Sequence, residues 1–391
     1  MTALPAFSID DAEGLILSTI AGTNAHEMVM LDAAAGRCTA AAVFATAAQP
    51  RFDAAAMDGW AICAGAGAAY HIVGESRAGW GFADRLAPGQ AVRISTGAPM
   101  PAGATALVRR ERGRIAGQML QVEDCRSGRD IRPRGCDFHA GDLLVPAGKR
   151  LDPLDLARMA ASGIDRLAVW QRPQVAILAT GDEITPVGVA PDAFGNHDAL
   201  SPALQARLTQ LGAQATHLGI ARDDDGDIAD RIAASDAALF LVVGGASGGR
   251  HDRVRAALSD AGLSVLVPHV GMRPGKPFWF GRLARGCFLF GLPGNPVAAL
   301  VALELFVVPA LRALQGLPAQ PDWIDVAMPD VPVVAGHEHV RFAHMGWSRQ
   351  GVLQVEPLGQ SDSAALRPLL GANALLRQRP QGQAQLLPIH A

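Results

Sequence analysis

The chain has 391 residues, which is longer than one hydrophobic core usually serves, so its length predicts two to four domains. Hydrophobic residues make up 49% of it and charged residues 18%, a balance that excludes an intrinsically disordered chain. A formal net charge of -3 provides no basic surface for nucleic acid or an anionic membrane, so we expect neither as a partner.

The cysteines and the terminal segments indicate a cytoplasmic protein. The five cysteines are odd in number and form no CxxC pair, which argues against a disulfide framework and a zinc ribbon. Residues 8–13 are acidic and lack the basic-then-apolar order of a signal peptide. The most apolar segment, residues 297–314, contains Glu304 and Pro309, so we expect a buried helix and not a membrane span.

The N-terminal part of the chain changes character twice. Apolar residues at helical spacing predict one or two short helices within 10–31. Short apolar runs separated by Gly and Pro, from about 43 to 144, are typical of a β-rich module. A helix is then predicted over 152–162, before the pattern changes at 171–173.

From residue 174 to about 317 the chain alternates predicted strands with predicted helices. The strands cover 174–179, 216–220, 237–243 and 287–290, and the helices cover 203–211, 227–234, 252–261 and 297–311. Strands that are apolar throughout and interleaved with helices predict a parallel sheet covered on both faces. After residue 318 the pattern of short strands and turns returns, which predicts a small C-terminal β-domain.

The predicted parallel strands end in polar, glycine-rich turns. These turns are 180–183 (Thr-Gly-Asp-Glu), 222–224 (Arg-Asp-Asp), 244–249 (Gly-Gly-Ala-Ser-Gly-Gly) and 291–296 (Gly-Leu-Pro-Gly-Asn-Pro). Ligands bind outside the carboxyl ends of strands in such sheets, and glycine turns ahead of helices hold phosphate without a net basic surface. The alternative is that these glycines only form tight turns.

The sequence excludes two common phosphate motifs and predicts a cation site at the same edge. No GxGxxG follows the first strand, and Lys276 lies in Pro-Gly-Lys-Pro, which is not a Walker A loop. Asp182, Glu183, Asp223 and Asp252 supply the oxygen ligands that Mg²⁺ takes beside a phosphate. Helix capping and solvation are the alternative roles for such carboxylates.

Taken together, the motifs resemble those of the MoeA and gephyrin E-domain family over nearly the full length. The similar segments, in the family's order, are 50–61, 93–103, 131–137, 180–183, 245–252, 274–277 and 291–296.

The resemblance implies a multidomain α/β architecture. An elongated first domain would comprise 1–42 with 143–170, and a β-rich domain would be inserted at 43–142. A molybdopterin-binding parallel α/β domain would cover 171–317, and a C-terminal β-barrel 318–391. The resemblance also implies a homodimer whose active site lies between the third domain of one subunit and the second domain of the other.

The implied function is molybdenum cofactor biosynthesis as a molybdopterin molybdenumtransferase. Molybdate would be inserted into adenylylated molybdopterin with release of AMP, in a reaction that depends on Mg²⁺ or a similar cation. A molybdopterin adenylyltransferase and the recipient molybdoenzymes are the implied protein partners.

The resemblance also assigns residue roles. The implied catalytic residues are Asp58, Thr96, Glu183, Asp223 and Lys276, of which Glu183, Asp223 and Asp58 would bind the metal. The implied residues for substrate, phosphate and molybdate are Arg132, Asp137, Thr180, Gly181, Gly245, Ser247, Gly248, Asp252, Arg273, Pro293, Gly294, Asn295 and Pro296.

Several positions depart from the family pattern. They are Ala56 for Ser, Trp60 for Tyr, Cys136 for Glu, Leu200 for Asn, Gly248 for Val, Arg250 for Glu and Arg273 for Lys. Glu to Arg reverses a charge, and Arg does not reproduce the geometry of Lys. The alternative function is therefore a diverged paralogue that binds or delivers molybdopterin or its metal complex without inserting the metal.

Overall fold

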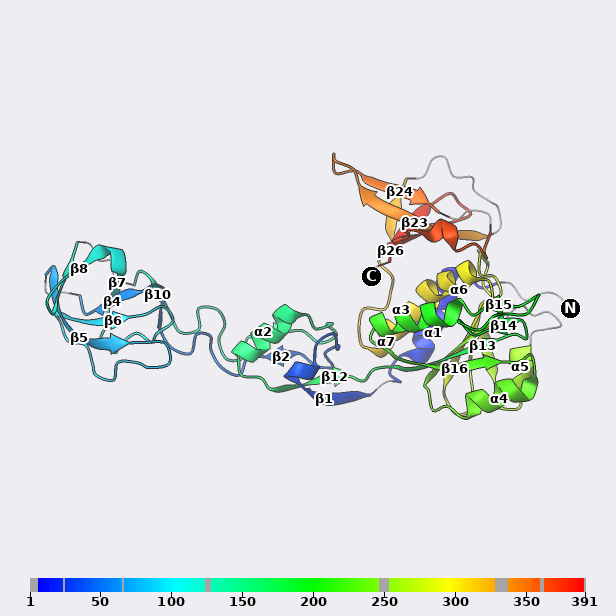
Figure 1. Ribbon diagram of the computed structural model, residues 1–391, viewed down its shortest axis with the longest axis horizontal. Helices are drawn as coiled ribbons and strands as arrows, with labels where there is room; N and C mark the ends of the chain where they lie inside the picture. The colour runs from blue at the N-terminus through cyan, green and yellow to red at the C-terminus, as the bar shows by residue number, and fades with distance from the viewer. Residues whose placement is uncertain are drawn as a thin grey trace.

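The computed structural model describes residues 6–23, 25–64, 67–123, 128–245, 253–327, 337–358 and 362–389. The molecule is elongated, with a distal β-sheet at one end, a small connecting part in the middle, and an α/β unit with a C-terminal sheet at the other end (Figure 1).

The distal part confirms the predicted β-rich module. Its sheet has the order β7-β4-β6-β5-β9-β8. The strands are β4 (Gly59–Ile62), β5 (Ala69–Ser76), β6 (Gln90–Ile94), β7 (Ala106–Arg109), β8 (Gly113–Ala116) and β9 (Met119–Val122). A shorter pair, β3 (Ala54–Ala55) with β10 (Ile131–Arg132), lies beside it. Trp60, Ile62 and Leu120 pack together in its core.

The middle part is built from antiparallel pairs that carry the chain out to the distal sheet and back. β1 (His26–Met30) pairs with β12 (Arg166–Trp170), and β2 (Val43–Phe44) pairs with β11 (Leu143–Val145). Helix α2 (Pro153–Ala161) begins at a reciprocal capping box between Asp152 and Asp155 and has proline at its first position, which explains its sharp start. Of the one or two short helices predicted within 10–31, one is confirmed as α1 (Ile9–Ile20). Residues 26–30 form a strand instead, with alternately exposed and half-buried side chains.

The α/β unit contains the predicted parallel strands. β16 (Gln214–Ala221), β13 (Gln174–Thr180), β17 (Leu239–Val243) and β21 (Phe288–Leu292) are adjacent and parallel. Two strands that were not predicted extend the sheet. β20 (Trp279–Arg282) pairs antiparallel with β21, and β18 (Ser264–Val267) pairs antiparallel with β20 at the edge.

Helices cover both faces of this sheet, as predicted. Alternate residues of the central strands enter two different cores: Leu239 and Leu241 join one, and Phe240 and Val242 join the other. The first core packs on α1 (Ile9–Ile20), α3 (Leu200–Gln210) and the run α6 (Pro296–Ala302), η3 (Leu303–Val307) and α7 (Val308–Leu314). The second packs on α4 (Asp225–Ala233) and α5 (Arg253–Ala257).

The helix Pro296–Leu314 is long and apolar enough to cross a membrane, but 78% of its most apolar window is buried inside the protein. Its Glu304 forms a two-point ion pair with Arg207 of α3, at 2.8 and 3.0 Å. The prediction of a buried core helix at this position is confirmed.

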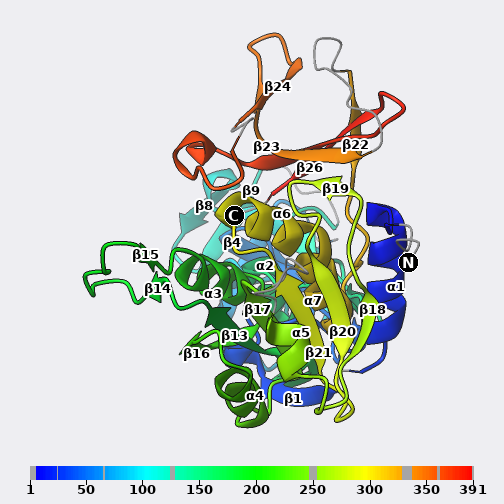
Figure 2. The same ribbon diagram turned by 90° about the vertical axis from the view of Figure 1, so that its right-hand side faces the viewer.

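The C-terminal sheet lies above the α/β unit (Figure 2). One of its strands, β19, comes from the α/β unit, between β18 and β20 in sequence. Its order is β19-β23-β25-β26-β22, with β24 paired to β23. The strands are β19 (Met272–Arg273), β22 (Ile324–Val326), β23 (Glu338–Trp347), β24 (Leu353–Pro357), β25 (Ala374–Gln378) and β26 (Ala384–Pro388). The pairings of the described residues form an open path, so the closed barrel stays a prediction.

Helix α1 ties the C-terminal sheet to the α/β unit. Its Ile9, Ile16 and Ile20 are buried in the α/β core, although residues 1–42 were predicted to belong to the elongated first domain. The guanidinium of Arg377, which is 1% exposed, donates to Glu338 at 2.5 Å and to Asp10 of α1 at 2.7 Å. A buried charge network of this kind is costly to break because the remaining charges lose their partners.

Glu13 lies beside this network on α1 and is 9% exposed. Burial raises the pKa of its carboxyl to about 7, and the negative charge of Asp10 adds to the rise while Arg377 opposes it. Between the ordinary value of 4.5 and about 7, folded Glu13 therefore holds a proton that the unfolded chain has released.

We predict that Glu13→Gln stabilises the protein above pH 7. Because the folded state binds more protons, the stabilisation from protonated Glu13 is complete below pH 4.5 and is lost as the pH rises through about 7. The loss is at most about 3.5 kcal/mol, at about 1.4 kcal/mol for each pKa unit between 4.5 and about 7. Urea denaturation should place the variant near the wild type at pH 5 and above it at pH 8. The exposed control Glu123→Gln should show no such pH-dependent gain, and a gain for Glu13→Gln that is equal at both pH values would contradict the prediction.

Candidate functional site

The turns after β13, β16, β17 and β21 meet at one edge of the α/β sheet, here called the rim, and enclose a cavity of about 690 Å³. Its wall is completed by the pair β14 (Ile184–Thr185) and β15 (Asn196–His197). The predicted residues that line the cavity are Thr180, Gly181, Glu183, Asp223, Gly245, Pro293, Gly294, Asn295 and Pro296. The structure therefore brings the predicted strand-end residues together, as the direction of parallel strands requires.

Glycine is required in two of these turns. Gly244 has a φ of +91°, and a Cβ there would lie 2.7 Å from the carbonyl oxygen of Thr180. Gly181 has a φ of +139°, and a Cβ there would lie 2.6 Å from Oε2 of Glu183. The absence of side chains at these positions lets the β13 and β17 turns approach each other and lets the Glu183 carboxylate fold back over its own turn.

Glu183 and Asp223 line the rim cavity, and so does Asp198, a carboxylate that was not predicted. The backbone N–H of Asp223 donates to Oδ1 of Asp182 at 3.3 Å, which ties the β13 turn to the β16 turn. Asp182 itself lines a neighbouring cavity. Thus two of the four carboxylates predicted at this edge line the rim cavity, a third faces the adjoining one, and Asp252 lies outside the described residues.

Two other predicted residues, Arg273 and Lys276, do not line the cavity, and three more lie outside the described residues. Ser247, Gly248 and Asp252 lie outside the described residues, which end at Gly245 before α5 begins at Arg253. Arg273 and Lys276 are exposed on the segment that leads from β19 to β20, whose Pro277 lines the cavity. Neither forms an ion pair with a residue in the described part of the chain.

A segment of the C-terminal domain also reaches the rim, and it was not predicted from the sequence. Ala364 and Leu366 line the cavity. The amide of Asn295 donates to the hydroxyl of Ser363 at 2.9 Å, and the backbone N–H of Val297 donates to the carbonyl of Ser363 at 2.9 Å. No motif marks this segment, and the contact joins residues 68 positions apart, so only the folded chain reveals it.

The remaining predicted residues lie together in the distal part. Oδ1 of Asp58 accepts hydrogen bonds from the backbone N–H of Thr96 at 2.7 Å and from its hydroxyl at 2.9 Å. These bonds, the backbone one first, hold the pKa of Asp58 below its ordinary value, so the carboxylate stays charged. Arg132 and Asp137 line a cavity of about 580 Å³ that includes Gly97, the neighbour of Thr96.

One chain does not bring Asp58 to Glu183 and Asp223. The distal sheet and the α/β unit lie at opposite ends of the molecule, with the middle part between them (Figure 1). Within the described ranges of a single chain, no group of three or more Asp, Glu, His or Cys side chains could enclose a metal ion. The three-carboxylate metal site therefore stays a prediction and would require a second copy of the chain.

The rim residues fit a magnesium ion that is held together with a phosphate. Mg²⁺ typically takes one or two protein carboxylates and completes its octahedral shell with phosphate oxygens and water. Glu183 and Asp223 supply two carboxylates on one cavity, and glycine-containing turns border them. This donor set suits a cation that shares its shell with a bound substrate.

We predict that Gly244→Ala distorts the rim. The added Cβ would meet the backbone oxygen of Thr180, and alanine at positive φ costs a further ~1–2 kcal/mol. Urea denaturation should show a loss of at least about 1 kcal/mol relative to the wild type. The matched control is Gly294→Ala, whose Cβ would meet nothing closer than 3.8 Å. Equal stability of the two variants would contradict the proposed close approach of the turns.

Comparisons with known proteins agree with this arrangement. A family model described as "MoeA N-terminal region (domain I and II)" matches residues 7–163, and one described as "Probable molybdopterin binding domain" matches residues 176–313.

Relatives of known name cover most of the chain. A molybdopterin molybdenumtransferase from Nostoc sp. is 33% identical over 80% of this chain and 76% of its own length. One from Haemophilus influenzae is 28% identical over 94% and 93%. Molybdopterin molybdenumtransferase 2 of Mycobacterium tuberculosis is 35% identical over 74% and 75%.

Solved structures share the fold. Two crystal structures of a molybdopterin biosynthesis MoeA protein from Pyrococcus horikoshii superpose with TM-scores of 0.84 and 0.80, at 23% and 24% identity. They cover 99% and 98% of this chain and all of the compared chains. From the identities, the family models and the common architecture, the chain belongs to the MoeA family of molybdopterin molybdenumtransferases.

Proposed function

We propose that the protein inserts molybdate into adenylylated molybdopterin and releases AMP, as a Mg²⁺-dependent molybdopterin molybdenumtransferase. The observation that carries this proposal is the rim cavity, where Glu183 and Asp223 share a cavity with glycine-containing turns and the Pro293–Pro296 segment. The relatives are named molybdopterin molybdenumtransferases, and this name supplies the substrate class. We further expect a cytoplasmic enzyme that receives its substrate from a molybdopterin adenylyltransferase and passes its product to molybdoenzymes.

The chain's own groups would bind and orient the reacting anions. Glu183 and Asp223 would hold Mg²⁺, which when bound offsets negative charge that builds up on phosphoryl oxygens. The backbone N–H of Gly245 and the positive end of the dipole of the helix that begins at Pro296 would orient the anionic groups. Ser363 would keep Asn295 in place at the cavity wall through their 2.9 Å hydrogen bond. Fixed donors of this kind lower the barrier because they need no rearrangement during the reaction.

A second candidate function is a paralogue that binds or delivers the pterin without inserting the metal. Two residues that depart from the family pattern line cavities, and this observation favours the second function. Leu200 replaces an expected amide at the rim, and Cys136 replaces an expected carboxylate in the distal cavity. Both changes remove a polar group from a proposed binding surface.

We also propose that two copies of the chain form the complete site. Asp58 and Thr96 would then approach the rim of the partner, since they cannot approach their own (Figure 1). Apolar side chains exposed on the middle part offer a surface for this contact: Met28, Met30, Phe44 and Leu143 are each at least 50% exposed. Phe44 and Leu143 are cross-strand neighbours, so their side chains form one patch.

The proposed activity predicts AMP release that requires Glu183. Purified protein, adenylylated molybdopterin and molybdate should yield AMP only when Mg²⁺ or a similar ion is added. Glu183→Ala should lower the rate by about 100-fold or more, as removal of a group that stabilises transition-state charge does. The control Asp230→Asn, on the exposed side of α4, should retain full activity. Retention of the pterin by the wild type without AMP release would instead identify the delivery protein.

The shared site predicts complementation between inactive variants. In a mixed dimer of Asp58→Ala and Glu183→Ala, one of the two sites contains only intact residues and the other contains both changes. After equimolar mixing and subunit exchange, half of the dimers are mixed, so about a quarter of the wild-type activity should return. The unmixed variants serve as controls. A mixture as inactive as its components would show that each chain uses its own Asp58 and Glu183.

A further inference from the structure

The rim cavity is lined by acidic groups and is poor in cationic ones. The carboxylates of Glu183, Asp198 and Asp223 line it, and none of its described lining residues is arginine or lysine. The proposed substrate brings a pyrophosphate, whose negative charges repel these carboxylates. A single Mg²⁺ ion cannot offset the charge of the carboxylates and the pyrophosphate together, so a further cationic group is expected at the site.

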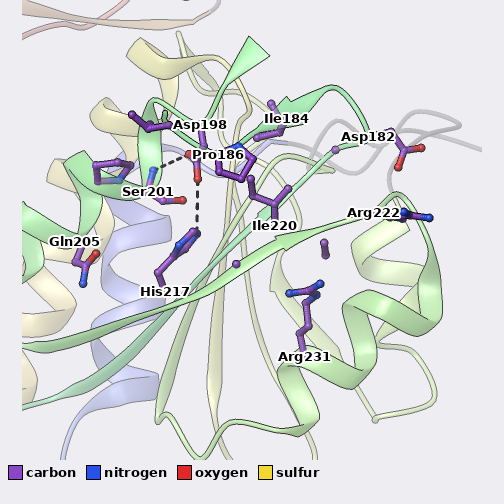
Figure 3. Close-up of a pocket in the computed structure, with 15 residues that line it drawn as sticks. Asp182, Ile184, Pro186, Asp198, Ser201, Gln205, His217, Ile220, Arg222 and Arg231 are labelled. Atoms are coloured by element: carbon purple, nitrogen blue, oxygen red, sulfur yellow. Dashed lines mark hydrogen bonds and ion pairs between the residues drawn. The ribbon is translucent and has the colours of Figure 1, made fainter. Parts of the chain in front are cut away.

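The arginines of the same chain that lie closest in the fold serve a different cavity. Figure 3 shows this adjoining cavity, of about 710 Å³, with Arg222 and Arg231 near the end that holds Asp182. Arg231 is held in place by Asp227 at 2.6 Å and by the carbonyl of Leu218 at 2.9 Å. Neither arginine lines the rim cavity, and the basic residues of β19 and the turn after it do not line it either. The described part of one chain therefore provides no guanidinium in the rim cavity.

Arg110 lies beside Asp58 on the distal part, the residue proposed to reach the rim of the partner. Its backbone N–H donates to the carbonyl oxygen of Asp58 at 3.1 Å. The two are neighbours because Gly59, the first residue of β4, pairs with Arg109, the last residue of β7. A Cβ at Gly59 would lie 1.9 Å from the carbonyl oxygen of Val108, so glycine permits this approach. A contact that brings Asp58 to a rim therefore brings Arg110 with it.

Two consecutive arginines at the end of β7 have different surroundings. The guanidinium of Arg109 binds both carboxylate oxygens of Asp130, at 2.8 and 2.6 Å, and so stabilises the distal part itself. Arg110 begins the short 3-10 helix η2 (Arg110–Arg112), and its side chain is exposed. It forms no ion pair with a residue in the described part of the chain. The hydrogen bonds to Asp58 lower the pKa of its carboxyl first, and the nearby charge of Arg110 lowers it further.

We propose that Arg110 is a substrate-binding residue that acts on the rim of the partner, where its guanidinium binds phosphoryl oxygens beside the metal held by Glu183 and Asp223. The inference rests on the proposed function and the two-copy site, which supply the pyrophosphate and bring Asp58 to the rim. A guanidinium suits this role because its planar fork binds two phosphate oxygens at once and stays charged. Arginines supplied by a second polypeptide stabilise phosphoryl charge in other enzymes in the same way.

The first test is calorimetric titration of the full-length protein with inorganic pyrophosphate in the presence of Mg²⁺. Arg110→Ala should weaken pyrophosphate at least about 10-fold, because a charge-assisted contact is lost. Arg110→Lys keeps the charge but not the two-point geometry, so its affinity should lie between the two. The matched control is Arg114→Ala on β8, whose exposed guanidinium lies 3.4 Å from Glu123 and whose loss should change the affinity less than about 2-fold. All these side chains are exposed, so the urea midpoints should not change.

Mixed dimers show on which chain Arg110 acts. After equimolar mixing and subunit exchange of Arg110→Ala with Glu183→Ala, half of the dimers are mixed, and each has one intact site. About a quarter of the wild-type number of full-affinity pyrophosphate sites should return, together with the same fraction of AMP release. A mixture of Arg110→Ala with Asp58→Ala should restore neither, because both changes lie on the distal part and every site contains one of them.

Two results would overturn the inference. One is pyrophosphate affinity that is equal in the wild type and Arg110→Ala. The other is recovery of full-affinity sites when Arg110→Ala is mixed with Asp58→Ala, which would place Arg110 at the rim of its own chain. The proposed function fails separately, if the wild type releases no AMP from the adenylylated pterin, because the titrations need no turnover.

Discussion

The site depends on the common direction of β13, β16, β17 and β21. Parallel pairing sends the carboxyl end of each strand to the same edge, so turns that are far apart in sequence must meet there. The strands cannot slide to relax a crowded rim, since alternate side chains are locked into two cores. Burial of each such aliphatic or aromatic side chain stabilises the folded state by about 1.5–3 kcal/mol, which a change of register would lose. The close approach of the turns must therefore be accommodated at the rim. Gly181 and Gly244 allow it because neither has a side chain that would clash.

The same rigidity limits what one chain can assemble. β2 and β11 carry the chain away from the α/β unit, and the distal sheet holds Asp58 against Thr96 at the far end (Figure 1). Glu183 and Asp223 lie at the rim, and the charged carboxylate of Asp58, the third predicted metal ligand, lies on the distal part. Their separation within one chain is the physical reason to expect that a second chain completes the site.

The fold was predictable wherever local pattern decides structure. Uniformly apolar runs identified the parallel strands, and residues 152–162 contained the capping box that starts α2. Strands β18 and β20 were missed because each has only four residues, too few to show a periodic pattern. The position of α1 was also missed, since its contact with Arg377 and Glu338 joins the two ends of the chain.

The site was predictable to the extent that it consists of strand-end turns. Glu183, Asp223, Gly245 and Asn295 were placed at one edge by the sheet direction alone, and they line one cavity. The Ser363 contact and the adjoining cavity depend on tertiary packing, which spacing in the sequence does not encode. His217 and Asp198, for example, belong to a strand and a helix start with no shared motif.

The most direct test of the two-copy site is photo-crosslinking between isotopically distinct chains. A benzophenone amino acid at exposed Met57, next to Asp58, would be activated in a mixture of ¹⁴N-labelled and ¹⁵N-labelled protein. The account predicts crosslinked peptides of mixed isotope that join residue 57 to rim segments such as 181–198 or 293–296. Crosslinks to the rim found only within chains of one isotope, or none to the rim at all, would contradict it.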